Sequence, residues 1–305
     1  MKNIKDLLKL STDLKPFRLI VAHAQDEAVI EAVDHVMGLK IIEPILVGDK
    51  NKIQTILMSK GYDVLKYTII HSESDVESAK IAVAFIKEDK ADVLMKGLLE
   101  TKVLLKAVVD KEFGIKNKKL LSHVALMSYP RRKKVLFATD CAMVTNPSIE
   151  DKKEIIENAI SLTHALGYQM TKVGLVSSVE KPNPRIQSSV EALELKTYYD
   201  TIKKKNFIVD GPFAVDNLVS AEAAMTKSIH SIVAGDADVL VFPNIDSGNV
   251  FYKTSVFLAG AEVAGIVVGA KAPIVLTSRA DSSKSKLYSI LLAGVYQHGL
   301  QIINH

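Results

Sequence analysis

Short apolar runs of strand length alternate with segments of helical periodicity along the whole chain. The apolar runs predict strands at residues 18–22, 44–47, 67–70, 93–95, 123–127, 135–138, 172–176, 207–209, 239–242, 266–269 and 274–276. The periodic segments predict helices at residues 1–8, 27–37, 53–60, 76–88, 102–109, 149–166, 190–203, 221–233 and 282–297. This alternation is typical of parallel βαβ units and therefore predicts an α/β fold.

The chain has 305 residues, a length at which chains commonly divide into two domains. Pro and Asn interrupt the periodic pattern at residues 139–148, and a second interruption covers residues 265–273. We therefore expect a first αβα domain from residues 1–142 and 271–305, and a second αβα domain, residues 143–270, inserted in the first.

Composition narrows the class of protein. The net charge is +4 and aromatic residues make up 6%, without the concentrated basic charge of nucleic-acid-binding proteins, so we expect no nucleic-acid partner. No apolar run is long enough to span a membrane and no secretory leader opens the chain, which predicts a protein that is neither membrane-bound nor secreted. The single cysteine, Cys141, fits a reducing cytoplasm.

Small polar residues follow the strand predicted at residues 239–242. In open α/β sheets ligands bind outside the carboxyl ends of the strands, so Asp246-Ser-Gly-Asn249 lies where a ligand is expected. On a helix beginning near Gly248, Asn249 and Lys253 are one turn apart and share a face. They would reach one ligand together, or one patch of solvent.

A second junction of this kind is Thr277-Ser-Arg-Ala-Asp-Ser-Ser283, between a predicted strand and the last predicted helix. Asp281, Ser282 and Ser283 suit either helix capping or ligand binding. Arg279 has no role in capping, and its planar guanidinium matches phosphate oxygens. Ser278 is placed to donate a hydrogen bond to a reacting atom.

A third strand end is Lys96-Gly-Leu-Leu-Glu-Thr101, where Thr101 is a candidate helix cap. Lys102 and Lys106, four residues apart on the following predicted helix, face either solvent or phosphate. Cys141 is more easily explained as a small buried side chain than as a nucleophile. The chain has no P-loop, dinucleotide-binding glycine motif or nucleophile elbow, and its eight histidines lack metal-ligand spacing, so each histidine is interpreted as a core or surface residue.

The segment 242–253, Phe-Pro-Asn-Ile-Asp-Ser-Gly-Asn-Val-Phe-Tyr-Lys, resembles the Pro-Asp-x-x-x-Gly-Asn-x-x-Tyr-Lys segment of the phosphate acetyl- and butyryltransferases. Residues 276–279, Leu-Thr-Ser-Arg, resemble the C-terminal Ser-Arg motif of that family. Residues 43–48, 137–142 and 209–212 match as well, and the similarity extends from residue 19 to residue 293. Residues 277–281 resemble the butyryl branch in particular.

This resemblance implies two αβα domains with mainly parallel sheets, as in isocitrate and isopropylmalate dehydrogenases, with the active cleft between the domains. It implies reversible exchange of a butyryl group between coenzyme A (CoA) and inorganic phosphate, by direct transfer in a ternary complex. No metal or redox cofactor is expected. The implied partners are the small-molecule substrates and further copies of the chain, as a dimer or higher oligomer, with butyrate kinase as the pathway neighbour.

The resemblance also implies roles for individual residues. Arg279 would hold phosphate or the oxyanion, Ser278 would donate a hydrogen bond, and Asp281 would act as the base. The expected substrate-binding residues are Lys96, Thr101, Ser247, Gly248, Asn249, Tyr252 and Lys253. The acetyl branch has an acidic residue seven positions after the serine, where this chain has Ser285. The alternatives are an acetyl-, propionyl- or branched-chain transferase, a two-lobed dehydrogenase, or a binding protein without catalytic activity.

Overall fold

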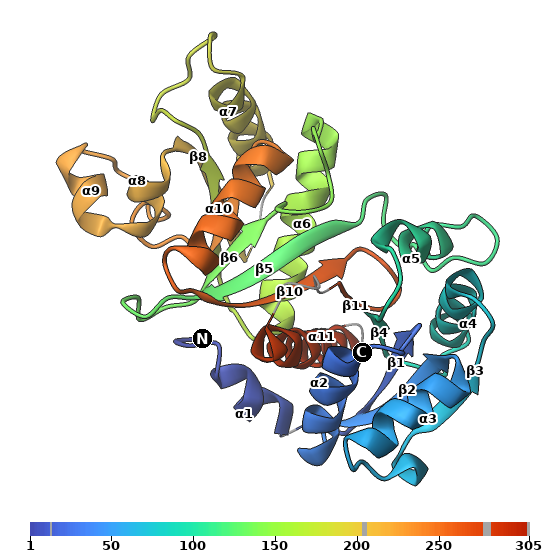
Figure 1. Cartoon of the computed structure of the whole chain (residues 1–305). Coiled ribbons are helices and arrows are strands. Elements are labelled where there is room, and N and C mark those ends of the chain that lie inside the picture. Colours follow the sequence, from blue (N-terminus) through green and yellow to red (C-terminus); the bar gives the residue numbers. More distant parts are fainter. Residues whose placement is uncertain (13, 203–205, 277–281, 304–305) are drawn as a thin grey trace. The chain divides into compact units, whose positions relative to one another are not determined.

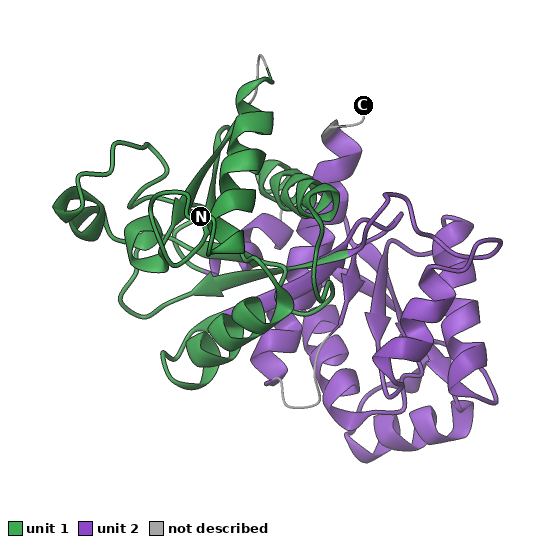
Figure 2. Ribbon diagram, turned by 90° about the horizontal axis from the view of Figure 1, so that it is seen from above, with its two compact units in different colours: residues 1–3, 122–262 green, residues 4–121, 263–305 purple. Residues whose placement is uncertain are grey.

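A computed structural model describes residues 1–12, 14–202, 206–276 and 282–303 (Figure 1). The chain divides into two compact units (Figure 2). Unit 1 contains residues 1–3 and 122–262, and unit 2 contains residues 4–121 and 263–305. No helix among the described residues is long and apolar enough to cross a membrane.

Unit 2 is built on a sheet with the strand order β3-β2-β1-β4-β11-β10. Strands β3, β2, β1, β4 and β11 are parallel, and β10 is antiparallel to β11. Its strands are β1 (Phe17–Ala22), β2 (Ile42–Gly48), β3 (Thr68–His71), β4 (Val93–Lys96), β10 (Glu262–Val268) and β11 (Ile274–Val275). Its helices are α1 (Asp6–Thr12), α2 (Glu27–Gly38), α3 (Lys50–Ser59), the 3-10 turn η1 (Val64–Lys66), α4 (Asp75–Lys87), α5 (Thr101–Val108) and α11 (Ser283–Ile303).

The strand order of unit 2 reverses direction at β1. The chain moves outward from β1 through β2 to β3 and then returns to β4 on the other side of β1. Because such crossovers are right-handed, the reversal places α4 on the opposite face of the sheet from α2 and α3. Helix α2 packs against α3 and α11, and α4 packs against α5, as expected for a sheet covered on both faces.

Unit 1 has the strand order β5-β6-β9-β7-β8. Strands β6, β9, β7 and β8 are parallel, whereas β5 is antiparallel to β6. Its strands are β5 (Ser122–Ser128), β6 (Leu136–Thr139), β7 (Thr171–Val176), β8 (Phe207–Phe213) and β9 (Val239–Val241). Its helices are α6 (Ile149–Ala165), α7 (Gln187–Asp200), α8 (Val215–Val219), α9 (Ala221–Thr226) and α10 (Ile245–Phe257).

Each strand predicted from an apolar run is present, and the α/β class with mainly parallel sheets is confirmed. The helix predicted at residues 221–233 is too long, because α9 ends at Thr226 and Ser228 takes a left-handed conformation with φ 52°. The expected division of the chain also differs from the observed units. Strands β5 and β6 were expected in the first domain, but β6 pairs with β9 and joins the inserted unit.

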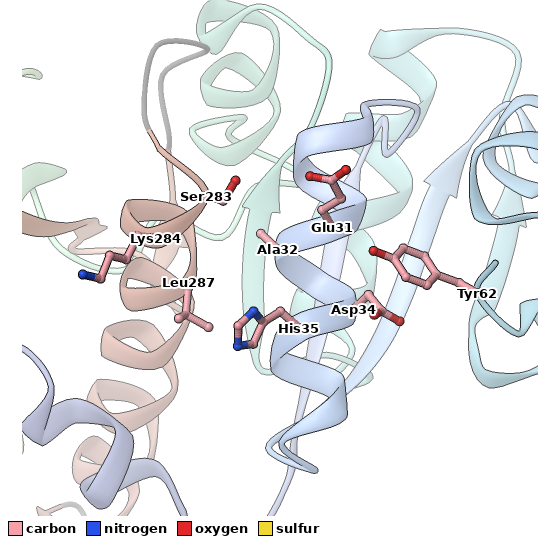
Figure 3. A pocket seen from close by; sticks show the side chains of 8 residues that line it. All are labelled: Glu31, Ala32, Asp34, His35, Tyr62, Ser283, Lys284 and Leu287. Carbon is pink, nitrogen blue, oxygen red and sulfur yellow. The ribbon is translucent and has the colours of Figure 1, made fainter. Parts of the chain in front are cut away.

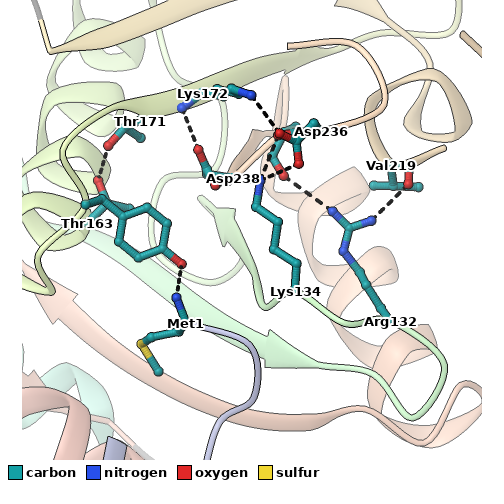
Figure 4. A network of polar contacts seen from close by, with 11 residues as sticks. Met1, Arg132, Lys134, Thr163, Thr171, Lys172, Val219, Asp236 and Asp238 are labelled. Atoms are coloured by element: carbon teal, nitrogen blue, oxygen red, sulfur yellow. Dashed lines mark hydrogen bonds and ion pairs between the residues drawn. The ribbon is translucent and has the colours of Figure 1, made fainter. Parts of the chain in front are cut away.

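A network of ion pairs ties together the amino ends of the parallel strands in unit 1 (Figure 4). Asp238, directly before β9, accepts the backbone N–H of Lys172 at 2.8 Å and pairs with the Lys134 ammonium at 2.8 Å. Asp236 pairs with the same two lysines, at 2.6 and 2.7 Å. Burial opposes ionisation of Asp236, but the two ammonium groups outweigh it and lower the pKa of this carboxyl. The network therefore joins the amino-terminal ends of β6, β7 and β9, at the edge of the sheet opposite their carboxyl ends.

Two matched substitutions test this network. The side chain of Asp238 is 5% exposed and that of Asp236 is 53% exposed. Asp238→Ala leaves a buried N–H without its acceptor, and we expect the free energy of unfolding to fall by about 1–3 kcal/mol. Asp236→Ala removes two ion pairs, to Lys134 and Lys172, that solvent screens. We expect the free energy of unfolding to fall by about 1 kcal/mol or less. Urea unfolding followed by circular dichroism measures both, and equal losses would contradict this interpretation.

Candidate active site

Helix α10 begins at the carboxyl end of β9, where its first turn carries the residues singled out in the sequence. Asn244 caps the helix, since its side chain accepts the Ser247 N–H at 3.0 Å. The Ser247 hydroxyl donates back to the Asn244 carbonyl at 2.9 Å. The helix therefore begins at Ile245, three residues before the start predicted near Gly248, and Ser247 stabilises its first turn.

Gly248 brings α10 into close contact with the turn that follows β6. A Cβ atom at this position would lie 2.3 Å from the Asp140 carbonyl oxygen and 3.1 Å from the Cys141 Cα, so only glycine fits. One residue on, the Asn249 amide donates to the Cys141 carbonyl at 3.3 Å. The predicted pair Gly248 and Asn249 thus docks α10 on the carboxyl end of β6.

The turn itself is held by the carboxylate of Asp140. One oxygen accepts the backbone N–H groups of Ala142 and Met143, both at 2.8 Å, and the other accepts the N–H of His123 at 3.0 Å. Asp140 is 3% exposed, and burial raises the pKa of its carboxyl while the backbone donors act in the opposite direction. Its role in this turn could not be read from the sequence.

Tyr252 and Lys253 lie on the next turn of α10. The Lys253 ammonium is 5.4 Å from the centre of the Tyr252 ring and 5.9 Å from that of Phe257. Tyr252 meets the buried ring of His123 edge to face, with ring centres 6.1 Å apart. In the sequence analysis His123 was only one of several scattered histidines. The structure brings it to α10, beside two of the predicted binding residues.

Cys141 lies in the same turn and is 1% exposed. Burial, together with the nearby Asp140 carboxylate, raises the pKa of its thiol well above the ordinary value. The thiol is therefore protonated at neutral pH, which agrees with the interpretation of Cys141 as a buried side chain rather than a nucleophile.

Lys96 and Thr101 lie in unit 2, at the carboxyl end of β4. This strand is next to β1, the point at which the strand order reverses and at which open sheets bind ligands. Lys96 is buried, and its ammonium donates to the carbonyl oxygens of Gly97 and Leu99 at 3.1 and 3.0 Å. Thr101 was a candidate helix cap, but it is the first residue of α5, and the N-cap Glu100 makes no side-chain capping bond.

Three predicted catalytic residues, Ser278, Arg279 and Asp281, lie outside the described residues. The helix that follows them is capped by Ser282, whose hydroxyl accepts the Ser285 N–H at 3.1 Å. Ser285, at the position where the acetyl branch has its acid, is in the first turn of α11, and its hydroxyl lies 3.2 Å from that of Ser282. Of the capping candidates that the structure describes, Ser282 has the capping role.

A surface cavity of about 520 Å³ in unit 2 lies between α2, α11 and Tyr62 (Figure 3). Two of its carboxylates already have partners: Glu31 pairs with Lys60 at 2.7 Å, and Asp34 accepts the Tyr67 hydroxyl at 2.5 Å. The described lining carries these two carboxylates together with Lys284 and includes none of the expected substrate-binding residues, so this cavity is a poorer candidate for the reacting anion than the lysine-bearing face of α10.

Residues 76–294 match the family model described as phosphate acetyl/butaryl transferase. A probable phosphate butyryltransferase of Bacillus subtilis strain 168 is 43% identical over 95% of this chain and 96% of its own. A phosphate butyryltransferase of Clostridium beijerinckii is 39% identical over 96% of this chain and 97% of its own. The chain therefore belongs to the phosphate acetyl/butyryltransferase family and is a phosphate acyltransferase, which transfers an acyl group between CoA and phosphate.

Solved structures agree with this assignment. A branched-chain phosphotransacylase from Enterococcus faecalis V583 superposes with a TM-score of 0.85 and 32% identity, over 92% of this chain and 99% of its own. A putative 4-hydroxythreonine-4-phosphate dehydrogenase from Salmonella typhimurium matches with a TM-score of 0.56 and 14% identity, over 93% and 100% of the two chains. The second match concerns the fold alone, and it confirms the dehydrogenase-like architecture that the sequence resemblance implied.

The close contact at Gly248 gives a test of the site. In Gly248→Ala the added methyl group would push α10 away from the Asp140 turn and displace Asn249 and Lys253. We expect a fall in kcat/KM of about 100-fold, since a displacement of about 1 Å has that effect in well-ordered sites.

Gly38→Ala is the matched control, because a Cβ at position 38 in α2 meets nothing within 4 Å. This control should keep full activity and lose no stability. Steady-state kinetics and melting temperatures are measured on both variants. Full activity of Gly248→Ala would mean that the contact between α10 and the turn does not position the site.

Proposed function

We propose that the chain is a phosphate butyryltransferase, which converts butyryl-CoA and inorganic phosphate to butyryl phosphate and CoA, and the reverse. The observation that carries this proposal is the full-length similarity to two phosphate butyryltransferases, one of them named as probable, at 43% and 39% identity. Direct transfer in a ternary complex is part of the proposal. The buried, protonated thiol of Cys141 supports it, because this group is no candidate for a covalent acyl-enzyme.

The proposal assigns roles to residues that follow strand ends, taken in each unit by itself. Lys253 and Asn249 would hold the acyl phosphate, with Ser247, Gly248 and Tyr252 shaping the helix that carries them. Arg279 would bind phosphate or the oxyanion, Ser278 would donate a hydrogen bond, and Asp281 would take the thiol proton when CoA attacks. Thr101 is proposed as a further substrate contact, and Lys96 as a residue that affects substrate binding through the turn after β4. For Lys96 the contribution is the shape of the turn after β4, because its ammonium is bonded to the carbonyls of that turn.

The proposed acyl transfer requires that the two substrates are correctly positioned and that developing negative charge is stabilised. In the direction of acyl phosphate synthesis a phosphate oxygen attacks the thioester carbonyl, the carbon–sulfur bond breaks and the CoA thiolate leaves with the electron pair. Cations near the phosphate and a donor near the developing oxyanion lower the barrier. Holding both substrates in one site supplies much of the remaining acceleration. A homo-oligomer in the cytoplasm, with butyrate kinase consuming the butyryl phosphate, completes the proposal.

The main alternative is another acyl chain. Similarity to the branched-chain phosphotransacylase favours a branched substrate, and the family model covers acetyl transfer as well. Neighbouring acyl chains differ by one methylene, which in an apolar pocket changes binding by about 1–3 kcal/mol. The enzyme should therefore accept neighbouring acyl chains as well, with different values of kcat/KM.

A comparison of acyl-CoA substrates tests the proposal. We expect kcat/KM to be highest with butyryl-CoA and to fall by about 10- to 200-fold for each methylene removed, through propionyl- to acetyl-CoA. The measurement is release of CoA thiol that depends on added inorganic phosphate, with a phosphate-free reaction as the control. A higher kcat/KM with isobutyryl- or acetyl-CoA would replace the butyryl assignment by the corresponding one.

Arg279→Ala tests the proposed anion contact. Loss of a guanidinium that stabilises developing charge should reduce kcat by about 100- to 1,000-fold and weaken the dependence of rate on phosphate. Arg185→Ala, on the loop between β7 and α7, is a control that removes an exposed guanidinium outside the proposed site. Normal turnover of Arg279→Ala with an unchanged phosphate dependence would exclude Arg279 from the site.

A further inference from the structure

His123 is an unusual residue to find buried at the carboxyl edge of unit 1. It is 7% exposed, and its main chain is fixed on both sides: the N–H donates to Asp140 and the carbonyl accepts the Thr139 hydroxyl at 2.9 Å. These bonds place the side chain at the start of β5, next to the end of β6. The position of the ring is therefore set by the same turn that carries α10.

One nitrogen of the ring has no hydrogen-bond partner among the described residues. Nδ1 is buried and has no hydrogen-bond partner among the described residues, and of the two ring nitrogens only Nδ1 is both buried and unpaired. A buried polar atom without a partner is destabilising, and native structures contain few of them. The ring forms an edge-to-face pair with Tyr252, and the positive charge of Lys253 acts on it. Burial, reinforced by this positive charge, lowers the pKa of His123 to about 4, so the ring is neutral at physiological pH.

A neutral imidazole carries one proton, on either of its two nitrogens. Buried N–H groups without an acceptor are rarer than buried acceptors without a donor, which favours a bare Nδ1 and a proton on Nε2. The ring then offers one N–H donor near Tyr252 and within reach of the Lys253 charge, on the helix that is proposed to hold the acyl phosphate. An uncharged donor suits this place, because it binds an anionic oxygen without adding a second positive charge next to Lys253.

We propose that His123 is a substrate-binding residue, whose Nε2–H donates a hydrogen bond to an oxygen of the phosphate or acyl phosphate held on α10. This inference rests on the proposed site at Lys253 and Asn249 and adds a residue to it. The bond involves no proton transfer: Nε2 keeps its proton, and the imidazole stays neutral through the reaction. Its effect is to orient the phosphate oxygens relative to the thioester.

Two substitutions of similar size separate a binding role from a packing role. The amide of glutamine reaches the place of Nε2, whereas the amide of asparagine reaches only the place of Nδ1. We expect His123→Asn to lower kcat/KM for inorganic phosphate by about 10- to 100-fold, the range for a hydrogen bond to a charged group. His123→Gln should retain activity within about 10-fold of the wild type, because it keeps a donor at the Nε2 position.

The controls separate the possible failures. Tyr129→Phe removes the 2.8 Å bond to Ser255 that joins β5 and α10 away from His123, and it should lower the melting temperature without changing the KM for phosphate. Lys253→Met tests the site itself. If Lys253→Met changes the phosphate dependence but His123→Asn equals His123→Gln, the role of His123 is overturned and the site stands. If neither Lys253→Met nor His123→Asn changes it, the proposed site fails as well.

A measurement on the wild-type protein tests the proposal without requiring that a variant folds. With ¹⁵N-labelled histidine, the His123 ring should show a protonated Nε2 and a bare Nδ1, and added inorganic phosphate should shift the Nε2 resonance. The His123→Gln spectrum assigns the signal. A protonated Nδ1, or a ring resonance unmoved by saturating phosphate, overturns the proposal.

Discussion

The carboxylate of Asp140 is the interaction on which the described part of the site depends. Its two oxygens accept three backbone N–H groups, two from the turn after β6 and one from His123 on β5. The turn gains its shape from these bonds, and α10 then docks on it through Gly248 and Asn249. A buried carboxylate is costly to desolvate unless donors surround it, so Asp140 is stable only where the backbone converges in this way. The same constraint fixes the ring of His123 beside Tyr252.

The two edges of the unit 1 sheet have different roles. At the amino ends, Asp236 and Asp238 bind Lys134 and Lys172 and hold strand starts together. At the carboxyl ends, the polar groups are only partly satisfied by the protein: His123 Nδ1 lacks a partner among the described residues. Charge pairs at the first edge add stability, whereas the second edge carries the residues that are proposed to bind substrate. Substitutions at the first edge should therefore lower the free energy of unfolding, whereas substitutions at the second edge should weaken substrate binding.

The sequence was sufficient to predict the strands, since those of a sheet covered on both faces are nearly continuous apolar runs. It also drew attention to Gly248, Asn249 and Lys253, because they follow a buried strand and because Asn249 and Lys253 are one helical turn apart. It could not identify Asp140 or His123. In sequence Asp140 is one acid after a strand, and His123 opens a strand seventeen residues earlier. Only the antiparallel pairing of β5 with β6 brings them together, and strand order is not readable from local periodicity. The start of α10 was misplaced because its cap is Asn244, four residues before the glycine at which the helix was expected to begin.

The charge state of this edge bears on how an acyl group would pass between two anionic substrates. Cys141, the only thiol of the chain, is sealed in the turn, and both burial and the Asp140 carboxylate disfavour its thiolate. His123 is kept neutral by burial and by Lys253. Neither group is prepared to attack a thioester, and His123 lies close enough to Lys253 for the positive charge to act on its ring. An edge that suppresses its own nucleophile and retains a cation and a neutral donor favours attack by bound phosphate itself. That is the physical argument for direct transfer over a covalent intermediate at this edge.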